Sequence, residues 1–248
     1  TECIRRTCMA KRWYQEHQRD TWRRQARNSG YRARSAFKLK QIQERHNIIR
    51  PGDSVLDIGC HPGGWTQVAL EEVGELGAVV GIDLRSTDPI DGASLLTGDV
   101  RDESIIARLS SENLDEGYNS VVSDISPSLT GRYDTDQAIS LDLSAMALDV
   151  AVKLLKPGGS FVTKAFQGTG IELLIEACKM RFSFVRRFSP TASRNASSEI
   201  YVVCKNKKPS SEGLDSAMEY IQQGLTDAGV LVGDEEEDEG PVVGFRRL

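Results

Sequence analysis

Asp83, Asp99 and Asp124 each stand at or just after the end of an apolar segment of the chain. If those segments are parallel strands, the three carboxylates meet at one edge of a sheet. There they can accept hydrogen bonds from ribose hydroxyls and from an adenine amino group. Any one of them could instead be a solvated strand end or a helix N-cap. The three together, after a glycine-rich turn, favour a ligand site.

The glycine-rich turn lies in residues 55–65, which read VLDIGCHPGGW. The apolar run contains Asp57 and passes through Gly59 into a segment with helical character. Glycines let the backbone approach a ligand closely, although the spacing is not the G-x-G-x-x-G of a dinucleotide site. Acids here favour a ligand with positive charge and ribose hydroxyls, as in S-adenosylmethionine, over a nucleoside polyphosphate. The alternative is a strand–helix turn without a ligand.

Two lysines and a glutamate are further candidates for chemistry. Lys164 ends a mostly apolar segment, so its side chain points either to solvent or into a cleft. Glu199 begins the apolar stretch 200–204 and could be simply a loop acid. Lys38, in a basic segment, would by itself be a surface lysine. Their types allow proton transfer, but position alone does not assign it.

The elements that must position these residues alternate between strands and helices. Such alternation predicts an α/β fold with a mostly parallel sheet and helices on both faces. Two helices, 10–28 and 31–49, are expected before the first strand. The remaining predicted elements are strands at 54–58, 78–83, 93–97, 119–124, 159–164, 183–188 and 199–204, and helices at 64–73, 102–111, 135–155 and 170–180.

The composition of the 248 residues is typical of a globular domain, with 39% hydrophobic and 27% charged residues. No apolar run approaches the roughly 18 residues of a membrane helix, and no signal-peptide core is present near the start. The five cysteines form no C-x-x-C pair, which argues against a disulfide framework and a zinc site. The sequence therefore predicts a cytoplasmic protein with reduced thiols, no metal and no membrane association.

The net charge of −5 conceals a strong asymmetry. Residues 1–50 contain 14 basic and 4 acidic residues, a balance of +10, whereas the remainder carries −15. Aromatic residues are interleaved with the basic ones, so they could stack on unpaired bases while Arg and Lys hold phosphates. The alternatives are a solvated helix face and a mitochondrial transit peptide. We expect the basic segment to contact nucleic acid.

The chain thus divides into three expected parts. Residues 1–50 form a basic, helical RNA-binding extension, and residues 51–206 form the α/β domain. Residues 207–248 form a C-terminal extension, with apolar residues at helical spacing over 214–225 and six consecutive acids at 234–239. By its charge, that acidic run could compete with RNA for the basic surface.

Four ordered residues carry a more specific signal. Lys38, Asp124, Lys164 and Glu199 match, residue by residue, the K-D-K-E tetrad of the RrmJ/FtsJ ribose 2′-O-methyltransferases, which the chain resembles over about residues 11–206. Cys60 and His61 depart from the small residues usual before Pro-Gly-Gly-Trp, and Ser126 and Ser128 stand where Ala and Asn are frequent. The flanking motifs also match: 35–39 (SAFKL), 62–65 (PGGW), 124–127 (DISP), 158–168 (GGSFVTKAFQG) and 198–201 (SEIY).

The resemblance implies a Rossmann-like, S-adenosylmethionine-dependent methyltransferase whose seventh strand is antiparallel to the others. It implies that Lys164 is the proton acceptor and that Lys38, Asp124 and Glu199 complete the catalytic set. Asp57 and Gly59 of the glycine-rich turn are expected to bind the cofactor as well. Carried over residue by residue, the cofactor-binding positions of the family are Gly63, Trp65, Asp83, Asp99 and Asp124.

The implied reaction is an in-line attack of a ribose 2′-hydroxyl on a sulfonium methyl group. A ribose hydroxyl is a weak nucleophile, so removal of its proton during attack accelerates the reaction. An ammonium beside Asp124 and Glu199 holds its proton tightly. We therefore expect Lys38 and the sulfonium charge to offset those acids, with Lys164 orienting the hydroxyl and taking its proton late.

The resemblance favours a uridine of large-subunit rRNA as the substrate. We expect the enzyme to be a monomer that uses no metal. Relatives with the same tetrad act on tRNA or on mRNA caps, and both stay open. A small-molecule O-methyltransferase on the same fold is a rival, since fold does not fix function. A non-catalytic RNA-binding module is another, although the complete tetrad argues against it.

Overall fold

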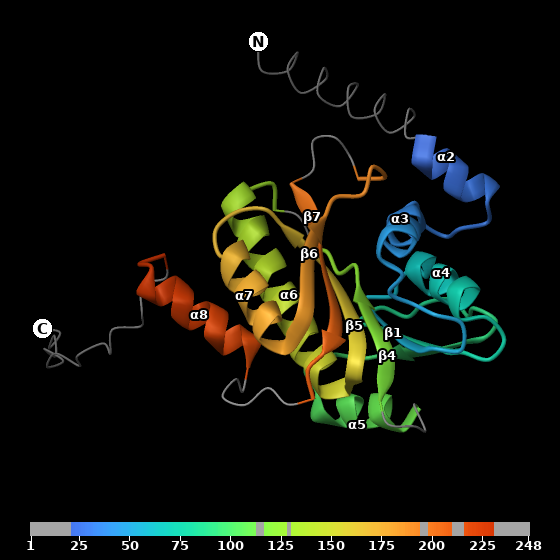
Figure 1. Ribbon diagram of the computed structural model, residues 1–248. Helices are drawn as coiled ribbons and strands as arrows, with labels where there is room; N and C mark the ends of the chain where they lie inside the picture. The colour runs from blue at the N-terminus through green and yellow to red at the C-terminus, as the bar shows by residue number, and fades with distance from the viewer. Residues whose placement is uncertain (1–20, 113–116, 128–129, 194–197, 210–215, 231–248) are drawn as a thin grey trace, which may run out of the picture.

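A single mixed sheet forms the centre of the molecule (Figure 1). The computed structural model describes residues 21–112, 117–127, 130–193, 198–209 and 216–230. Within these residues seven strands pair in the order β3-β2-β1-β4-β5-β7-β6. The strands are β1 (Ser54–Ile58), β2 (Ala78–Asp83), β3 (Ala93–Thr97), β4 (Tyr118–Ser123), β5 (Leu155–Phe166), β6 (Phe182–Phe188) and β7 (Glu199–Lys207).

The strand directions confirm the predicted mostly parallel sheet. β1 pairs in parallel with β2 and β4, β2 with β3, and β4 with β5. β7 is antiparallel to both of its neighbours, β5 and β6. The carboxyl ends of the parallel strands therefore share one edge of the sheet, and the first residues of β7 lie at that same edge.

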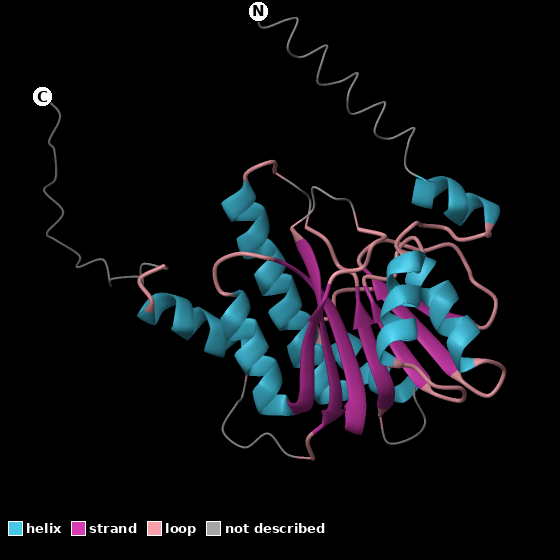
Figure 2. Ribbon diagram, turned by 45° about the horizontal axis from the view of Figure 1, so that its top comes forward, coloured by secondary structure: helices cyan, strands magenta, loops and turns pink. Residues whose placement is uncertain are grey.

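Helices cover both faces of the sheet (Figure 2). One face carries the helices that pack with Trp65, Phe37 and Tyr201, and the other carries the helices that pack with Leu148 and Leu174. The described helices are α2 (Thr21–Asn28), α3 (Ala36–His46) and α4 (Gly64–Val73) on the first face, and α5 (Glu103–Glu112), α6 (Tyr133–Leu154), α7 (Ile171–Arg181) and α8 (Ala217–Asp227) on the second.

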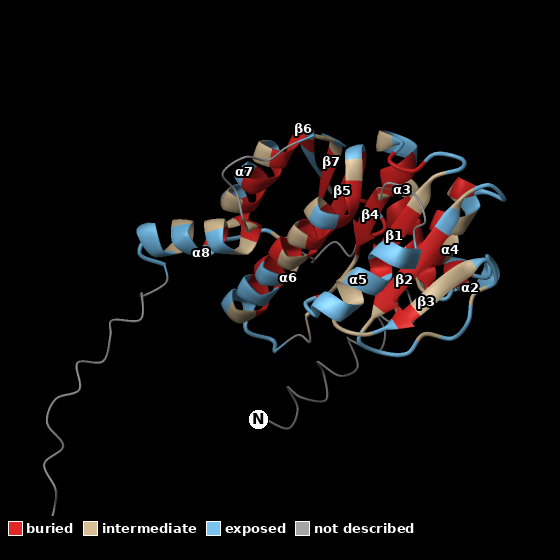
Figure 3. Ribbon diagram, turned by 90° about the horizontal axis from the view of Figure 1, so that it is seen from below, coloured by how far each residue is buried: buried red, intermediate tan, exposed pale blue. Residues whose placement is uncertain are grey.

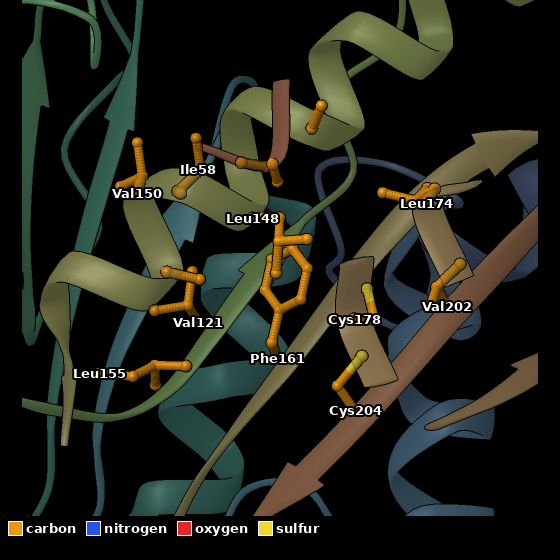
Figure 4. Packing of buried hydrophobic residues seen from close by; sticks show 14 of the residues in the cluster. Ile58, Val121, Leu148, Val150, Leu155, Phe161, Leu174, Cys178, Val202 and Cys204 are labelled. Atoms are coloured by element: carbon orange, nitrogen blue, oxygen red, sulfur yellow. The ribbon is translucent and has the colours of Figure 1, made fainter. Parts of the chain in front are cut away.

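Most strand residues are buried (Figure 3), and their apolar side chains belong to two clusters. Figure 4 shows part of one cluster, with Leu148, Phe161 and Leu174. Phe161 faces the layer beneath α6 and α7, and Val162 faces the layer beneath α3 and α4. Such alternation is expected for a strand covered on both faces. Cys60, Cys178 and Cys204 are buried free thiols, as predicted, while Cys3 and Cys8 lie outside the described residues.

Some element boundaries differ from those predicted. The expected helix 31–49 is shorter and spans Ala36–His46. It ends there because Asn47 has a left-handed backbone (φ 48°) and the Gln43 side chain accepts hydrogen bonds from the backbone N–H groups of Ile48 and Ile49. Only residues 21–28 of the expected helix 10–28 are described. α6 ends at Leu154, and β5 begins at Leu155 and not at the expected residue 159, with an irregular pairing to β4.

The described helices include none that is both long enough and apolar enough to cross a membrane. α6 has 22 residues, but several of them are charged. Among the described residues, no group of three or more His, Cys, Asp or Glu is arranged to hold a metal ion.

α8 is a packed part of the C-terminal extension. Its Ile221 is buried against α6 and α7. Asp149 of α6 accepts hydrogen bonds from the backbone N–H groups of Ala217 and Met218 and from the Ser216 hydroxyl, which caps the helix. A carboxylate at a helix N-terminus satisfies free donors and complements the helix dipole. The acidic run 234–239 lies outside the described residues.

Candidate active site

A cavity of about 670 Å³ opens at the carboxyl edge of β1, β2 and β4 and beside the loop after β3. This is where open α/β sheets bind their ligands. Gly59 has φ +80°, and a Cβ there would lie 2.5 Å from the side chain of Ile125. The segment after β4 can therefore pack this closely only against a glycine. The residues that line the cavity include Gly59, His61, Asp83, Leu84, Arg85, Asp99, Asp124, Ile125, Leu143 and Met146.

The three predicted aspartates do come together in this cavity. Asp83 accepts hydrogen bonds from the backbone N–H groups of His61 (3.1 Å) and Arg85 (2.8 Å). Asp99 accepts from the backbone and guanidinium of Arg101, and these hydrogen bonds lower the pKa of its carboxyl. Asp124 completes the set. All three can present carboxylate oxygens to hydroxyl or amino groups of a ligand.

Gly63 and Trp65, both predicted to bind the cofactor, are not among the lining residues of the cavity. Gly63 has φ +114° and precedes α4. The Trp65 indole donates a hydrogen bond to the Ser35 carbonyl (2.8 Å) and packs against the Tyr201 ring, with centroids 5.6 Å apart. In this conformation both support the wall between the cavity and α3, and their contact with a cofactor stays a prediction.

Asp57 lies behind the cavity rather than on its surface. Its side chain is fully buried, and one oxygen accepts a hydrogen bond from the Thr66 hydroxyl (2.7 Å). The other oxygen has no hydrogen-bond partner within the described structure. Burial raises the pKa of the Asp57 carboxyl to about 7, and the charges of Asp124 and Asp83 add to the shift. A cationic ligand group would stabilise the ionised form.

We expect Asp57→Asn to change the pH dependence of stability. Because the folded-state pKa is raised from 3.8 to about 7, folding favours the protonated acid. The stability it gives is complete below pH 3.8 and is lost as the pH rises through 7. The wild type should lose up to about 4 kcal/mol of unfolding free energy over that window, and the variant, which cannot ionise, should not. Urea unfolding from about pH 4 to pH 8 measures the difference, and parallel curves for the two proteins would contradict it.

The predicted tetrad forms two buried ion pairs beside the cavity. Lys164 Nζ lies 3.2 Å from Asp124 Oδ1 and donates a 2.8 Å hydrogen bond to the Asp124 carbonyl. Lys38 Nζ lies 2.6 Å from Glu199 Oε1. The two lysine residues are only 5–6% exposed. Charge-assisted contacts of this kind, shielded from water, hold side chains in one geometry.

Tyr201 connects the two ion pairs, and sequence reasoning gave it no role. Its fully buried hydroxyl donates to Asp124 Oδ1 (2.8 Å) and lies 3.4 Å from Glu199 Oε1. Burial, together with the adjacent Asp124 and Glu199, raises the pKa of Tyr201 well above 10, so the hydroxyl stays protonated. The signal for it was present, because residues i and i+2 of a strand share a face and Glu199 starts that strand.

The register of the sheet explains why residues so far apart in sequence meet. Ser123 pairs with Thr163, so the following residues, Asp124 and Lys164, are neighbours at the carboxyl ends of β4 and β5. Lys164 also pairs with Tyr201 across the antiparallel β5–β7 ladder. Glu199 reaches the same edge because β7 runs in the opposite direction and begins there.

Lys38 comes to this edge from α3, which packs on α4. Its ammonium lies 5.7 Å from the centroid of the Tyr201 ring. The Ser193 hydroxyl donates a 2.7 Å hydrogen bond to Glu199 Oε1, so the loop between β6 and β7 also holds this carboxylate oxygen. Sequence reasoning did not identify Ser193, because nothing in its local pattern separates it from other loop serines.

The electrostatics of the site centre on Asp124. Burial acts to raise the pKa of its carboxyl, but the positive charges of Lys164 and Lys38 and the hydrogen bond from Tyr201 outweigh burial and lower it. Asp124 is therefore ionised at neutral pH. Asp124 lines the cavity, and its carboxylate forms the ion pair with Lys164.

A family model described as FtsJ-like methyltransferase matches residues 31–207. The chain belongs to the FtsJ-like methyltransferase family. The match covers every described element from α3 to β7, including the cavity and both ion pairs. It confirms the resemblance drawn from the tetrad and its flanking motifs, and with it the fold class and the enzyme class.

Curated relatives are similar over most of the chain. A Halorubrum lacusprofundi protein named ribosomal RNA large subunit methyltransferase E is 46% identical over 189 residues, which are 75% of this chain and 70% of that protein. Proteins with the same name from Vesicomyosocius okutanii and Nitrosospira multiformis are each 38% identical, over 81% and 83% of this FtsJ-like chain and 95% and 100% of their own lengths.

Solved structures share the fold of this FtsJ-like methyltransferase. A Plasmodium falciparum protein described as a ribosomal RNA methyltransferase superposes with a TM-score of 0.65 at 27% identity, covering 71% of this chain and 98% of its own. A Lactococcus lactis protein described as a hemolysin gives a TM-score of 0.55 at 16% identity, over 78% of this chain and 98% of its own. At that identity the likeness shows the fold alone.

Proposed function

We propose that this FtsJ-like methyltransferase transfers a methyl group from S-adenosylmethionine to a ribose 2′-hydroxyl of large-subunit rRNA, most simply at a uridine. The observation that carries the proposal is that Asp124 belongs to two parts of the site. Asp124 lines the cavity, and its carboxylate pairs with the Lys164 side chain. A methyl donor in the cavity and an acceptor oxygen at Lys164 would thus meet at one residue.

The residues of the cavity fit S-adenosylmethionine. Asp83 and Asp99 can accept hydrogen bonds from ribose hydroxyls and an adenine amino group, while Ile125, Leu143 and Met146 offer apolar surface. Asp57 lies behind the cavity and does not line it, so it would favour a ligand with positive charge through its own charge and not by direct contact. When bound, the donor supplies an electrophilic methyl group on a sulfonium. We propose these residues, with Gly59, Gly63 and Trp65, as its binding set.

Lys164 is proposed to orient the acceptor hydroxyl and to take its proton. Two of its hydrogen-bonding directions are used by the Asp124 carbonyl and carboxylate, which leaves one direction for a substrate oxygen. In the neutral amine this direction carries the lone pair, so Nζ can take the hydroxyl proton as the oxygen–carbon bond forms and the carbon–sulfur bond of the donor breaks. The ammonium that results is paired with the Asp124 carboxylate. Proton transfer comes late, because bond formation makes the hydroxyl proton acidic.

Tyr201, Lys38 and Glu199 support the site around Lys164 and Asp124. Tyr201 fixes the Asp124 carboxylate through its hydroxyl. Lys38 and Glu199 form the second ion pair, and we propose that they contact the target ribose from the α3 side. Such alignment of the reacting groups can supply roughly 7–11 kcal/mol in a favourable case.

The names of the relatives and the charge of the chain support an rRNA substrate. The relatives are named as large-subunit rRNA methyltransferases. Residues 1–50 carry a balance of +10, which suits salt-dependent contact with phosphates. We propose residues 1–50 as the RNA-binding extension, with α3 also supplying Lys38, and 51–206 as the catalytic domain. With its ribosomal substrate, the enzyme is proposed to act as a cytoplasmic monomer, without metal.

Transfer of labelled methyl tests the proposal and separates its rivals. Wild-type protein is incubated with labelled S-adenosylmethionine and, in parallel, with large-subunit particles, their naked rRNA, bulk tRNA, capped RNA and free catechols. Label on the large-subunit rRNA supports the proposal, and label on tRNA or caps moves the substrate to those RNAs. Label on catechols alone would replace it with a small-molecule enzyme. RNA binding without any label would favour a non-catalytic binding module.

The acidic run gives a prediction about salt. A variant ending at residue 230 keeps α8, whose Ile221 is buried, and lacks the run 234–239. If the run competes with RNA, the variant should bind rRNA about threefold more tightly at low salt and equally at high salt. A full-length variant with the six acids changed to amides is the matched control. Equal affinities at low salt would contradict the competition.

A further inference from the structure

Arg32 stands out among the basic residues because its guanidinium binds the protein itself. One nitrogen donates to the carbonyls of Pro62 (3.3 Å) and Asp88 (2.6 Å), and the second donates to the carbonyl of Pro89 (2.6 Å). Its backbone N–H donates to the side chain of Gln67 in α4 (2.9 Å). Arg32, although it lies in the basic extension 1–50, thus donates hydrogen bonds to two loops of the catalytic domain.

The two loops that Arg32 joins form one side of the cavity. β2 ends at Asp83 and the loop after it begins with Leu84 and Arg85, and all three residues line the cavity. At its near end this loop is already tied to the 61–63 turn, because the His61 N–H donates to Asp83 and the His61 ring contacts the Ser86 carbonyl at 3.1 Å.

At its far end the same loop depends on Arg32. The carbonyls of Asp88 and Pro89 lie on the loop, and the carbonyl of Pro62 lies on the turn. Gly63 allows this approach, since a Cβ there would lie 3.2–3.3 Å from the Arg32 side chain and 2.6 Å from Ile90. Among the described residues, the hydrogen bonds to the Asp88 and Pro89 carbonyls come from Arg32, and the Ile90 side chain packs beside Gly63.

We propose that Arg32 is a positioning residue for the methyl-donor site, which it preorganises by holding the 84–90 loop against the 61–63 turn. The inference rests on the proposed function, because it concerns donor binding in the same cavity. A loop already held in place costs less free energy to order when a ligand binds. Arginine suits the task since its planar fork reaches several carbonyls at once, whereas a lysine ammonium is a point donor.

The test compares Arg32→Ala and Arg32→Lys with the wild type. Calorimetry with S-adenosylmethionine should show donor Kd raised about tenfold in Arg32→Ala and about threefold in Arg32→Lys. In methyl transfer, KM for the donor should rise in parallel, with kcat at saturating donor kept within about threefold. Hydrogen exchange should become faster within residues 84–92 and stay unchanged in β4 and β5.

Arg24→Ala is the matched control, since it removes one exposed arginine from the same basic segment. It should weaken RNA binding and leave donor Kd unchanged. If Arg32→Ala behaves like Arg24→Ala, Arg32 is only a phosphate contact and the inference is overturned. Faster exchange throughout the domain would overturn it too, because the effect would then be general loss of stability. A wild type that binds no S-adenosylmethionine would instead contradict the proposed function.

Discussion

Lys164→Ala should lower the rate of methyl transfer at saturating donor and RNA by about a thousandfold, within the usual range for a lost general base. Donor affinity should change little, because Lys164 is not among the residues that line the cavity. Single-turnover kinetics measures the chemical step, and calorimetry with S-adenosylmethionine measures binding. The effect is large because the Lys164 amine is the proposed proton acceptor and is held in a fixed, buried position.

Lys164→Arg separates proton transfer from charge. A guanidinium keeps the positive charge beside Asp124 but does not give up its proton at accessible pH. We therefore expect Lys164→Arg to lose nearly as much rate as Lys164→Ala while retaining more stability. Full turnover in Lys164→Arg would show that Lys164 is no base.

Asp124→Ala should affect both stability and activity. Removal of one partner from a buried ion pair leaves the other charge uncompensated, which costs about 3 kcal/mol or more. Here the lost carboxylate also accepts the hydrogen bond from Tyr201 and lines the donor cavity. We therefore expect the unfolding free energy to fall by about that amount, donor affinity to fall about tenfold, and methyl transfer to fall by at least about a thousandfold.

Asp124→Asn tests the charge alone. The amide oxygen can still accept from Tyr201, but Lys164 stays without its counter-charge, so only part of the lost stability should return. Urea unfolding, donor calorimetry and single-turnover rates are measured on both variants. If Asp124→Ala were as stable as the wild type and bound the donor equally well, Asp124 would not link the cavity to the ion pairs as proposed.

Much of the fold and of the site was predictable, because the apolar segments mark the strands and the site residues lie at the ends of those strands. Asp83, Asp99 and Asp124 were identified as acids that follow apolar segments, and parallel strands place such residues at one edge. The antiparallel direction of β7 did not follow from the residues and came with the family resemblance. That direction is what brings Glu199 to the edge.

Other features depend on contacts that a single sequence does not encode locally. Arg32 binds backbone carbonyls more than 50 residues away, and carbonyls leave no mark in the sequence of side chains. Ser193 is one of several serines in its loop and becomes distinctive only when Glu199 is beside it. Asp57 was expected in the ligand site, but whether its carboxylate faced the cavity or the core depended on side-chain packing.

The position of the transferred methyl group tests the central claim most directly. Large-subunit rRNA labelled by the wild type is hydrolysed in alkali, which cleaves RNA wherever the 2′-hydroxyl is free, and Lys164→Ala is run in parallel. We predict that label appears in alkali-resistant dinucleotides with the wild type and is lost with the variant. Label recovered in mononucleotides, as base methylation would give, would contradict ribose 2′-O-methylation at this site.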